Sequence, residues 1–397
     1  MTDEAEIDRR LDQVLAQHPP ATATTDEILD ALFDAGLAWV HFPPGHGGWD
    51  ASPDLQERVY RRLLAAGGPD YFMANPLGYA MGGPTVMTYG TEAQKAQHLR
   101  AIFKASSVWC QLFSEPSAGS DLANVSTRAV RDGDGWRVTG QKVWTTLGHI
   151  AGTAMLLART DPDAVKHRGL TYFLLDMHAP GVDVRPLRQM TGDAEFNEVF
   201  LDDVFVPDSD RLGDVGAGWQ VAMTTLSNER FIIGRDQPRG GGHIAVALQA
   251  WREREDCTSA EALALRDRLM ALYVQADVTW LTTVRATAGR EGRDPGPEGS
   301  VSKVLNAETN KEVSAFAVEL LGPAGMLYGL GDRAGYAHAD EADVQATPQY
   351  LALRARANSI EGGTTEVMKN ILAERWLGLP AEARVDKAQP WSQLPRG

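Results

Sequence analysis

The segment Gln111–Asp121, which reads QLFSEPSAGSD, joins a short apolar run to a stretch of small residues. Small residues let a backbone approach a large flat or phosphorylated ligand closely. The hydroxyls of Ser114 and Ser120 can form hydrogen bonds with ligand heteroatoms. The same pattern is typical of a strand that runs into an ordinary Ser-capped turn, because Gly/Ser turns are common. Taken alone, the segment favours neither interpretation.

The segment Gly140–Gly148 (GQKVWTTLG) places Trp144 at the end of an expected strand, directly before Thr145 and Thr146. An indole can cover one face of a ring system, and a threonine beside it can supply a hydrogen-bond donor. Aromatic residues in strands usually pack in a core. From position alone, core packing is therefore the favoured interpretation of Trp144.

The segment Ile360–Asn370 (IEGGTTEVMKN) places two glycines before an expected helix that starts near Thr364, in a pattern similar to a capping box. A helix N-terminus preceded by glycines suits anions or polar ligand groups. An ordinary capped helix explains the same residues.

Glu229 lies between Asn228 and Arg230 in a mostly apolar helical stretch. A carboxylate on an apolar face is desolvated, which raises its pKa toward the range of a general base. The alternative is a solvated Glu229, or one paired with Arg230, as is usual for charged helix residues.

Several other chemistries have no motif in this chain. The sequence contains no HExxH pattern and no Cys/His cluster, so no metal site is expected. It also lacks GxSxG, a Walker loop and GxGxxG, which argues against a serine hydrolase, a P-loop enzyme and a Rossmann site.

The spacing of apolar residues predicts three successive stretches. It is helical up to about residue 104, strand-rich from Val108 to Pro207, and helical again from Gly218. We expect an α+β protein that is mostly α, with an N-terminal helical domain (1–107), a central antiparallel β-barrel or sandwich (108–216), a C-terminal four-helix bundle (217–380) and a flexible tail (381–397). The expected strands are Val108–Phe113, Thr127–Val130, Trp136–Trp144, Ala154–Ala158, Leu170–Leu175 and Val199–Val206. The expected later helices are Trp219–Gly234, His243–Arg254, Ala262–Gly289, Gly299–Leu321 and Thr364–Leu377.

Composition narrows the class of protein. The chain has 397 residues with 43% hydrophobic and 23% charged residues, which is typical of a globular protein of two to three domains. Its net charge of −15 argues against sequence-independent nucleic-acid binding. Two cysteines cannot form a disulfide framework, and no apolar run is long enough for a membrane span. The N-terminus lacks the pattern of a signal peptide, so we expect a cytoplasmic protein.

Taken together and in this order, the segments resemble those of the acyl-CoA dehydrogenase family. The resemblance runs from about Thr24 to Leu379, and its most specific parts are SEPSAGSD, GQKVWTT and IEGGTTEVMKN. It implies fatty-acid or lipid metabolism and an FAD bound between the β-domain and the C-terminal helices. The residues that it places at the flavin are Gln111, Leu112, Phe113, Ser114, Gly119, Ser120, Trp144, Thr145, Thr146, Thr364 and Glu366. A looser match at Glu319 and Gly322 corresponds to the stretch that reaches the FAD of a neighbouring subunit.

The resemblance also implies a reaction, the α,β-dehydrogenation of an acyl thioester. Many members carry the catalytic Glu directly before Gly-Thr, where this chain has Gly362, with Glu361 one residue earlier. Long-chain-type and isovaleryl-type members carry it instead in a segment like Asn-Glu-Arg, which matches Glu229. We therefore expect Glu229 to be the base and keep Glu361 as the fallback. Ser120, Arg230 and the backbone N–H of Gly362 are the expected contacts to the substrate.

The expected partners follow from the same resemblance. They are an acyl-CoA or a carrier-bound acyl thioester, electron-transfer flavoprotein as acceptor, and further copies of the chain in a dimer or tetramer. The basic-x-x-Phe segment that usually contacts the neighbour's FAD is not evident around 252–262. This favours the alternative of a heterotetramer in which a related chain completes the FAD site. A flavin monooxygenase on the same fold is a further alternative, whereas acyl-CoA oxidases are usually longer.

Overall fold

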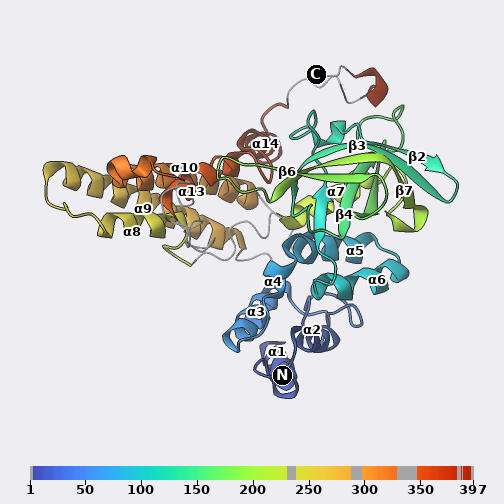
Figure 1. The fold of residues 1–397 in the computed structure, drawn as a ribbon, viewed down its shortest axis with the longest axis horizontal. Helices are drawn as coiled ribbons and strands as arrows, with labels where there is room; N and C mark the ends of the chain where they lie inside the picture. The colour runs from blue at the N-terminus through green and yellow to red at the C-terminus, as the bar shows by residue number, and fades with distance from the viewer. Residues whose placement is uncertain are drawn as a thin grey trace. The chain divides into compact units, whose positions relative to one another are not determined.

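The computed structural model describes residues 3–229, 238–287, 297–328, 347–381, 386 and 388–394. These residues form two compact units (Figure 1). The first unit contains residues 3–187, 195–229, 386 and 388–394, and the second contains residues 188–194 with the remaining described residues up to 381.

The first unit begins with helices, two of which start with a capping box. Thr24 caps α2 in a reciprocal capping box with Glu27, and Thr91 caps α6 in the same way with Gln94. The helices bury one aromatic cluster in which Trp39 stacks on Tyr79 with ring centroids 5.0 Å apart. Their bounds are α1 Asp3–Gln17, α2 Thr25–Asp34, η1 Pro53–Leu55, α3 Gln56–Ala65, α4 Tyr71–Ala74, η2 Gly78–Gly82, α5 Gly83–Tyr89 and α6 Glu92–Phe103.

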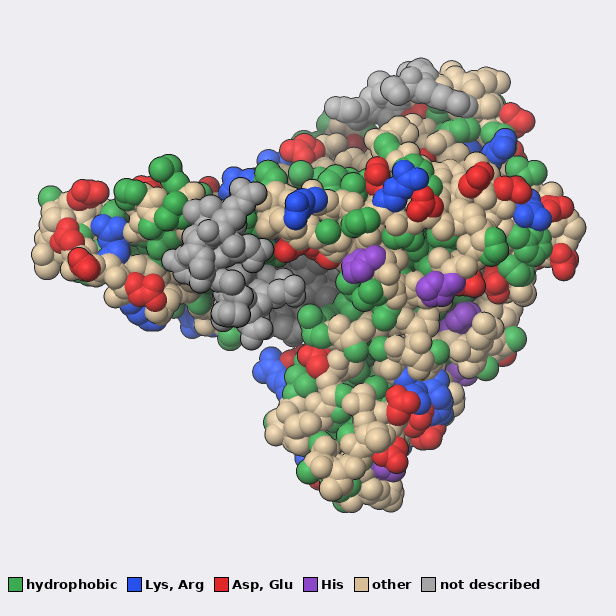
Figure 2. All heavy atoms as spheres, viewed as in Figure 1, with side chains coloured by type: hydrophobic (Ala, Val, Ile, Leu, Met, Phe, Trp, Pro, Cys, Tyr) green, Lys and Arg blue, Asp and Glu red, His purple; other side chains and the backbone are tan. Residues whose placement is uncertain are grey.

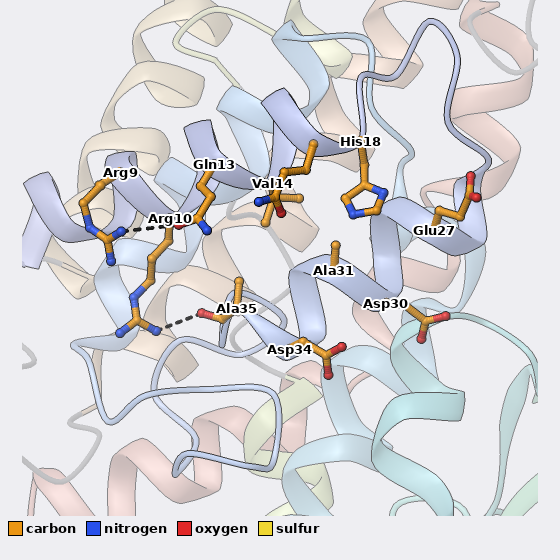
Figure 3. A pocket seen from close by; sticks show the side chains of 11 residues that line it. Arg9, Arg10, Gln13, Val14, His18, Glu27, Asp30, Ala31, Asp34 and Ala35 are labelled. Carbon is orange, nitrogen blue, oxygen red and sulfur yellow. Dashed lines mark hydrogen bonds between the residues drawn. The ribbon is translucent and has the colours of Figure 1, made fainter.

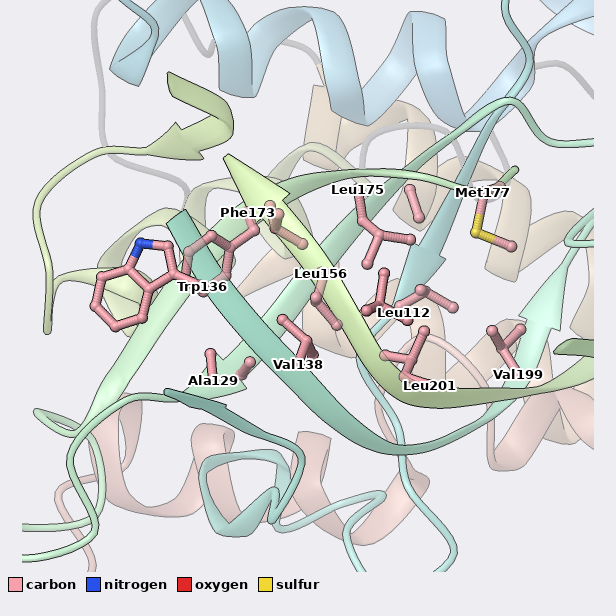
Figure 4. Close-up of a cluster of buried hydrophobic side chains, with 14 of the residues drawn as sticks. Leu112, Ala129, Trp136, Val138, Leu156, Phe173, Leu175, Met177, Val199 and Leu201 are labelled. Carbon is pink, nitrogen blue, oxygen red and sulfur yellow. The ribbon is translucent and has the colours of Figure 1, made fainter. Parts of the chain in front are cut away.

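The centre of the first unit is a sheet of eight strands in the order β6-β7-β3-β2-β4-β5-β8, with β1 paired to β4. Most neighbours are antiparallel, as expected, but β1 runs parallel to β4. Apolar side chains from β1, β3, β4, β5 and β7 meet in one buried core (Figure 4). The strands are β1 Trp109–Leu112, β2 Arg128–Asp132, β3 Gly135–Thr146, β4 Thr153–Arg159, β5 Leu170–Asp176, β6 Val182–Leu187, β7 Phe196–Pro207 and β8 Arg211–Leu212, with the short turns η3 Leu122–Asn124 and η4 Asp208–Asp210. The sequence did not predict β6, which pairs with β7 and alternates Val with exposed charged residues.

Helix α7, Gly218–Glu229, closes the first unit by packing on β5 and on α5. The compact unit therefore continues past the boundary that we expected at residue 216.

The second unit is helical, and α10 lies at its centre. α10 packs on α8 and α9 through a buried cluster that includes Ile244, Leu269 and Phe316. It also contacts the later helices α13 and α14. The elements are α8 His243–Arg252, α9 Ala260–Thr287, α10 Glu298–Leu320, η5 Gly322–Met326, α13 Pro348–Arg354, η6 Ala357–Ser359, α14 Thr365–Ile371 and η7 Leu372–Trp376. The helix expected at 364–377 is thus an α-helix that ends at Ile371 and continues as a π-helical turn.

The structure describes part of the tail that was expected to be loose. Trp391 lies in the short turn η8, Trp391–Gln393, and is 8% exposed. Residues 388–394 pack on the first unit, and the flexible tail expected over 381–397 stays a prediction.

One face of α9 carries large apolar side chains that are exposed. They are Leu263, Met270, Val274, Val278 and Leu281, whose spacing places them along a single helical stripe. Figure 2 shows hydrophobic side chains at the surface in this part of the second unit. Among the described helices, none combines the length and the apolar content that crossing a membrane requires.

Candidate functional site

Strands β1 and β3 bring two of the three predicted segments together in the first unit. The backbone N–H of Val143 donates to the carbonyl of Ser114 at 2.9 Å, directly after β1. The residues Gln111–Ser114 therefore lie beside the end of β3, which carries Trp144–Thr146.

A β-bulge turns Trp144 out of the core. The register between β3 and β7 shifts between Lys142 and Thr145, and Trp144 takes a φ of 62°. Its side chain is 60% exposed and meets Phe196 edge-on with ring centroids 6.0 Å apart. Core packing of Trp144, which position alone favoured, is thus excluded, and its indole is free to cover a planar ligand.

Two buried polar groups beside this bulge have no hydrogen-bond partner among the described residues. They are the amide nitrogen Nε2 of Gln111 and the hydroxyl of Thr145, whose residue is fully buried. A buried donor without a partner costs about 1–3 kcal/mol, so such groups are rare unless a ligand or water completes them. Flavin rings have flat faces that an exposed indole can cover, whereas these two enclosed donors have no surface open to a ligand.

The loop that follows β1 keeps its small residues at the surface. Glu115 and Ala118 pair through two backbone hydrogen bonds of 3.0 and 3.1 Å, which form a tight turn. Gly119 and Ser120 after this turn are exposed, and a Cβ atom added at Gly119 would meet open space. Leu112 was also predicted to contact the flavin, but its side chain is buried in the sheet core and packs there.

A buried ion pair beneath the loop was missed by the sequence analysis. The ammonium of Lys142 donates to Glu115 Oε1 at 2.9 Å and to the carbonyls of Phe113 (2.9 Å) and Leu157 (2.8 Å). Burial alone would raise the pKa of Glu115, but the charge of Lys142 and hydrogen bonds from Ser126 and Thr127 lower it to about 2. The ion pair between Lys142 and Glu115, whose side chains are both almost fully buried, therefore holds the start of the loop. The one signal in the sequence is a lysine inside an expected strand, directly before Val143 and Trp144.

Helix α7, which carries Glu229 as its last residue, is tied to the sheet and to α5 by hydroxyl groups. The hydroxyl of Thr225 lies 3.1 Å from the hydroxyl of Tyr172 on β5 and 3.0 Å from that of Thr85 on α5. All three side chains are fully or almost fully buried. The backbone position of Glu229, one helical turn after Thr225, is therefore set by this cluster. The side chain of Glu229 and the whole of Arg230 lie outside the described residues.

We expect Thr225→Val to destabilise the protein by about 1–3 kcal/mol, because it leaves the buried hydroxyl of Tyr172 without its partner. Urea unfolding followed by circular dichroism measures the change. Thr225→Ser keeps the hydroxyl and serves as the matched control. The double variant with Tyr172→Phe should recover part of the loss, and no recovery would contradict the assignment.

In the second unit, the third motif combines two glycines of positive φ with a capped helix start. Gly362 and Gly363 have φ values of 62° and 91°, which favour glycine, and Thr364 caps α14 by accepting from the N–H of Val367 at 3.1 Å. Glu366 is exposed in the first turn of α14, and the hydroxyl of Thr365 is buried without a partner among the described residues.

Glu361 is held on both carboxylate oxygens. Arg354 donates to Oε1 at 3.1 Å and to Oε2 at 2.9 Å, and Asn358 donates to Oε1 at 2.9 Å. Such a bidentate pair fixes the orientation of the carboxylate. Glu361 is therefore placed as a partner of Arg354 in the second unit.

The looser predicted match lies at the end of α10. Glu319 accepts a hydrogen bond from Arg268 on α9 at 2.6 Å, and both side chains are about half exposed. Gly322 follows the helix with a φ of 57° and has open space around it.

Lys303 on α10 is a second group that sequence reasoning missed. Its side chain is 9% exposed and its ammonium has no hydrogen-bond partner among the described residues. Burial lowers the pKa of Lys303, against the opposing charges of Glu361, Glu366 and Glu308. No sequence pattern distinguishes it from a surface lysine.

A surface hollow between α1 and α2 is lined by none of the residues of the three motifs (Figure 3). Its lining mixes side chains of both charges, among them Arg9, Arg10, Asp30 and Asp34. Arg10 donates to the carbonyl of Ala35 at 2.9 Å, as the dashed line in Figure 3 marks. This hollow therefore reflects the packing of two helices and adds nothing to the predicted site.

Comparison with protein families covers nearly the whole chain. The acyl-CoA dehydrogenase N-terminal domain matches residues 4–106, the middle domain matches residues 110–204 and the C-terminal domain matches residues 216–377.

Individual proteins agree with this assignment. The acyl-CoA dehydrogenase FadE34 of Mycobacterium tuberculosis is 39% identical over 353 residues, which are 88% of this chain and 46% of FadE34. The chain thus spans about half the length of that relative. The acyl-CoA dehydrogenase IpdE1 of the same organism is 37% identical over 89% of this chain and 87% of its own length. A solved structure described as the Tcur3481-Tcur3483 steroid ACAD is 25% identical, with a TM-score of 0.73 over 95% of this chain and 97% of that chain. The expected resemblance and fold are confirmed, and the chain belongs to the acyl-CoA dehydrogenase family, whose members are flavin-dependent oxidoreductases.

Proposed function

We propose that this chain binds FAD and catalyses the α,β-dehydrogenation of an acyl thioester to the trans-2-enoyl thioester. The observation that carries the proposal is the exposed indole of Trp144, which the bulge at the end of β3 turns outward beside the segment Gln111–Ser114. These residues lie on or directly after the two strands that carry the family motifs, in a chain whose family is flavin-dependent.

The residues divide the work between binding and proton transfer. Trp144, Thr145, Thr146 and the segments Gln111–Ser114 and Gly119–Ser120 hold FAD, with Thr364 and Glu366 contributing from α14. When bound, FAD supplies the hydride acceptor for the substrate Cβ. The backbone N–H of Gly362 polarises the thioester carbonyl, which makes the α-proton more acidic.

Glu229 takes the α-proton in this proposal, and Arg230 orients it or contacts the thioester carrier. Two observations favour Glu229 over Glu361. Glu229 ends a helix that a buried hydroxyl cluster holds in place, as a positioned base requires. Glu361 already uses both oxygens on Arg354 and Asn358, so it would have to leave that pair to act as a base.

A second candidate is that the active form is an assembly with a related chain. The apolar stripe on α9 exposes large side chains that a partner helix would cover. The match covers only 46% of FadE34. That relative is therefore long enough to contain a second region of about the length of this chain. The similar steroid ACAD is described by two joined names, Tcur3481 and Tcur3483, as a complex of two chains would be. We therefore propose a heterotetramer as the alternative to a homodimer or homotetramer, and electron-transfer flavoprotein as the electron acceptor.

The test is a visible spectrum of the purified protein before and after anaerobic addition of acyl-CoA esters. Straight-chain esters and esters that carry a steroid nucleus are titrated separately. A flavin band that bleaches supports the proposal and ranks the substrates. A flavin band that no ester bleaches argues against dehydrogenation and favours monooxygenation, which oxygen uptake would reveal. A colourless protein that gains the band only when a related chain is co-expressed favours the heteromeric form.

A further inference from the structure

Residues near the C-terminal end of the sequence dock on the sheet unit beside the loop that carries Gly119 and Ser120. We call residues 115–126 the cofactor loop, and Asp386 with residues 388–394 the tail segment. The backbone of Trp391 donates to the carbonyl of Ala164 at 3.0 Å, and that of Ser392 donates to the carbonyl of Pro162 at 2.8 Å. Pro390 forms a bridge with Val165, so the tail segment is fastened along the turn between β4 and β5.

The indole of Trp391 contacts the cofactor loop directly. Its Nε1–H donates to Asn124 Oδ1 at 2.7 Å, and Asn124 lies in the turn η3 of that loop. The guanidinium of Arg159 lies over the same indole, 4.2 Å from the ring centroid. At this distance a cation and an aromatic face attract each other, most strongly where water is excluded. Both side chains are almost fully buried.

Arg159 in turn holds the backbone of the cofactor loop. Its guanidinium donates to the carbonyls of Ala123 at 2.7 Å and Val125 at 3.1 Å, and to the carbonyl of Lys166 at 3.1 Å. Trp391 thus covers the arginine that fixes two successive parts of the loop.

A second connection reaches the residue next to Ser120. The buried ammonium of Lys166 lies 2.7 Å from the carboxylate of Asp121 and 3.0 Å from that of Asp386. One lysine therefore links the cofactor loop to the tail segment. On its other side, the loop is held by the Glu115–Lys142 pair, so Gly119 and Ser120 lie between two fixed points.

We propose that Trp391 is a positioning residue for FAD binding: through Asn124 and Arg159 it keeps the cofactor loop in the conformation that receives the cofactor. This inference rests on the proposed function, because it assumes that Gly119 and Ser120 contact FAD. Trp391 itself lies beneath the loop and acts through it.

The effect of Trp391 on FAD affinity depends on whether the cofactor loop is ordered before FAD binds. With the tail segment docked, the loop is ordered before FAD arrives, and binding does not have to supply the ordering entropy. Without the indole, one hydrogen bond and one cation–π contact are lost, and the loop samples other conformations. We expect Trp391→Ala to weaken FAD binding about tenfold or more. Trp391→Phe keeps the aromatic face but loses the hydrogen-bond donor. Its FAD affinity should therefore lie between those of the wild type and of Trp391→Ala.

Trp136 provides a matched control on another part of the same sheet. Its Nε1–H donates to Asp208 at 2.7 Å, and Arg131 lies 5.2 Å from its ring centroid. Trp136→Ala therefore removes the same two kinds of contact and a buried aromatic ring, but none of the contacts to the cofactor loop described above.

The experiment measures FAD dissociation constants of the apo-proteins by fluorescence quenching, and amide hydrogen exchange of residues 115–126 without FAD. The expected result is weaker FAD binding and faster exchange at 115–126 in Trp391→Ala, a smaller change in Trp391→Phe, and neither change in Trp136→Ala. Unchanged exchange at 115–126 in Trp391→Ala overturns the proposal, and so does an equal loss of FAD affinity in Trp136→Ala. If the wild-type protein binds no FAD either alone or with a co-expressed related chain, the proposed function fails, whereas the exchange result still decides whether Trp391 orders the loop.

Discussion

Replacing Glu229 with Gln should abolish reduction of the bound flavin by an acyl-CoA while the flavin stays bound. Glutamine matches glutamate in size but cannot take a proton, so the α-proton has no acceptor. Loss of a positioned general base costs about 10²–10⁴-fold in rate. Stopped-flow absorbance of the flavin band under anaerobic conditions measures the rate, and the spectrum before mixing shows whether FAD is still bound.

Glu361→Gln is the control for this prediction. Glu361 accepts hydrogen bonds from Arg354 and Asn358 and is held by them. Its replacement should therefore change the reduction rate far less than that of Glu229. The opposite outcome, with Glu361→Gln inactive and Glu229→Gln reduced at the wild-type rate, would show that Glu361 is the base.

Replacing Glu115 with Gln should destabilise the protein by about 3–5 kcal/mol, because it leaves the ammonium of Lys142 buried without its counter-charge. The neutral amide still fits the site, so the loss reports the missing charge. Thermal and urea unfolding measure it. The double variant with Lys142→Met removes both charges and should be more stable than Glu115→Gln alone. If the double variant is less stable than the single variant, the buried charge is not the cause.

The same pair predicts how stability depends on pH. The pKa of Glu115 is lowered to about 2 in the folded chain, below its usual value of 4.5, despite its burial. The folded state therefore binds fewer protons than the unfolded state in this range. The stabilisation is fully present above about pH 4.5 and is lost as pH falls toward 2, and its size is about 3 kcal/mol. In Glu115→Gln the decline between these pH values should be smaller than in the wild type.

The sequence predicted the elements whose signal is local. The period-2 and helical patterns were sufficient for most helices and strands. Strand β6 was missed because Pro186 interrupts a short alternating run at the edge of the sheet. The docking of Trp391 was missed because its partners, Asn124 and Arg159, lie far away in the sequence.

In the site, too, the features with a local sequence signal were predicted and those that depend on distant residues were not. The motifs predicted which segments matter, and the hydrogen bond between Val143 and Ser114 brings two of them together. What could not be predicted is how the side chains are held. The partners of Lys142 are set by packing between β3 and segments distant in the sequence, and the outward turn of Trp144 depends on a bulge against β7. Residue type and spacing carry no information on such pairings.

The tail segment also sets an order of events during synthesis. Trp391 is made 267 residues after Asn124, the residue to which it binds. At a ribosomal rate of about 5–20 residues per second, roughly 13–50 seconds separate the two. The sheet therefore leaves the ribosome and begins to fold while its cofactor loop still lacks Trp391. On the proposal above, a nascent chain that has not yet reached Trp391 should bind FAD more weakly than the chain that includes it, because its cofactor loop is not yet held by the indole.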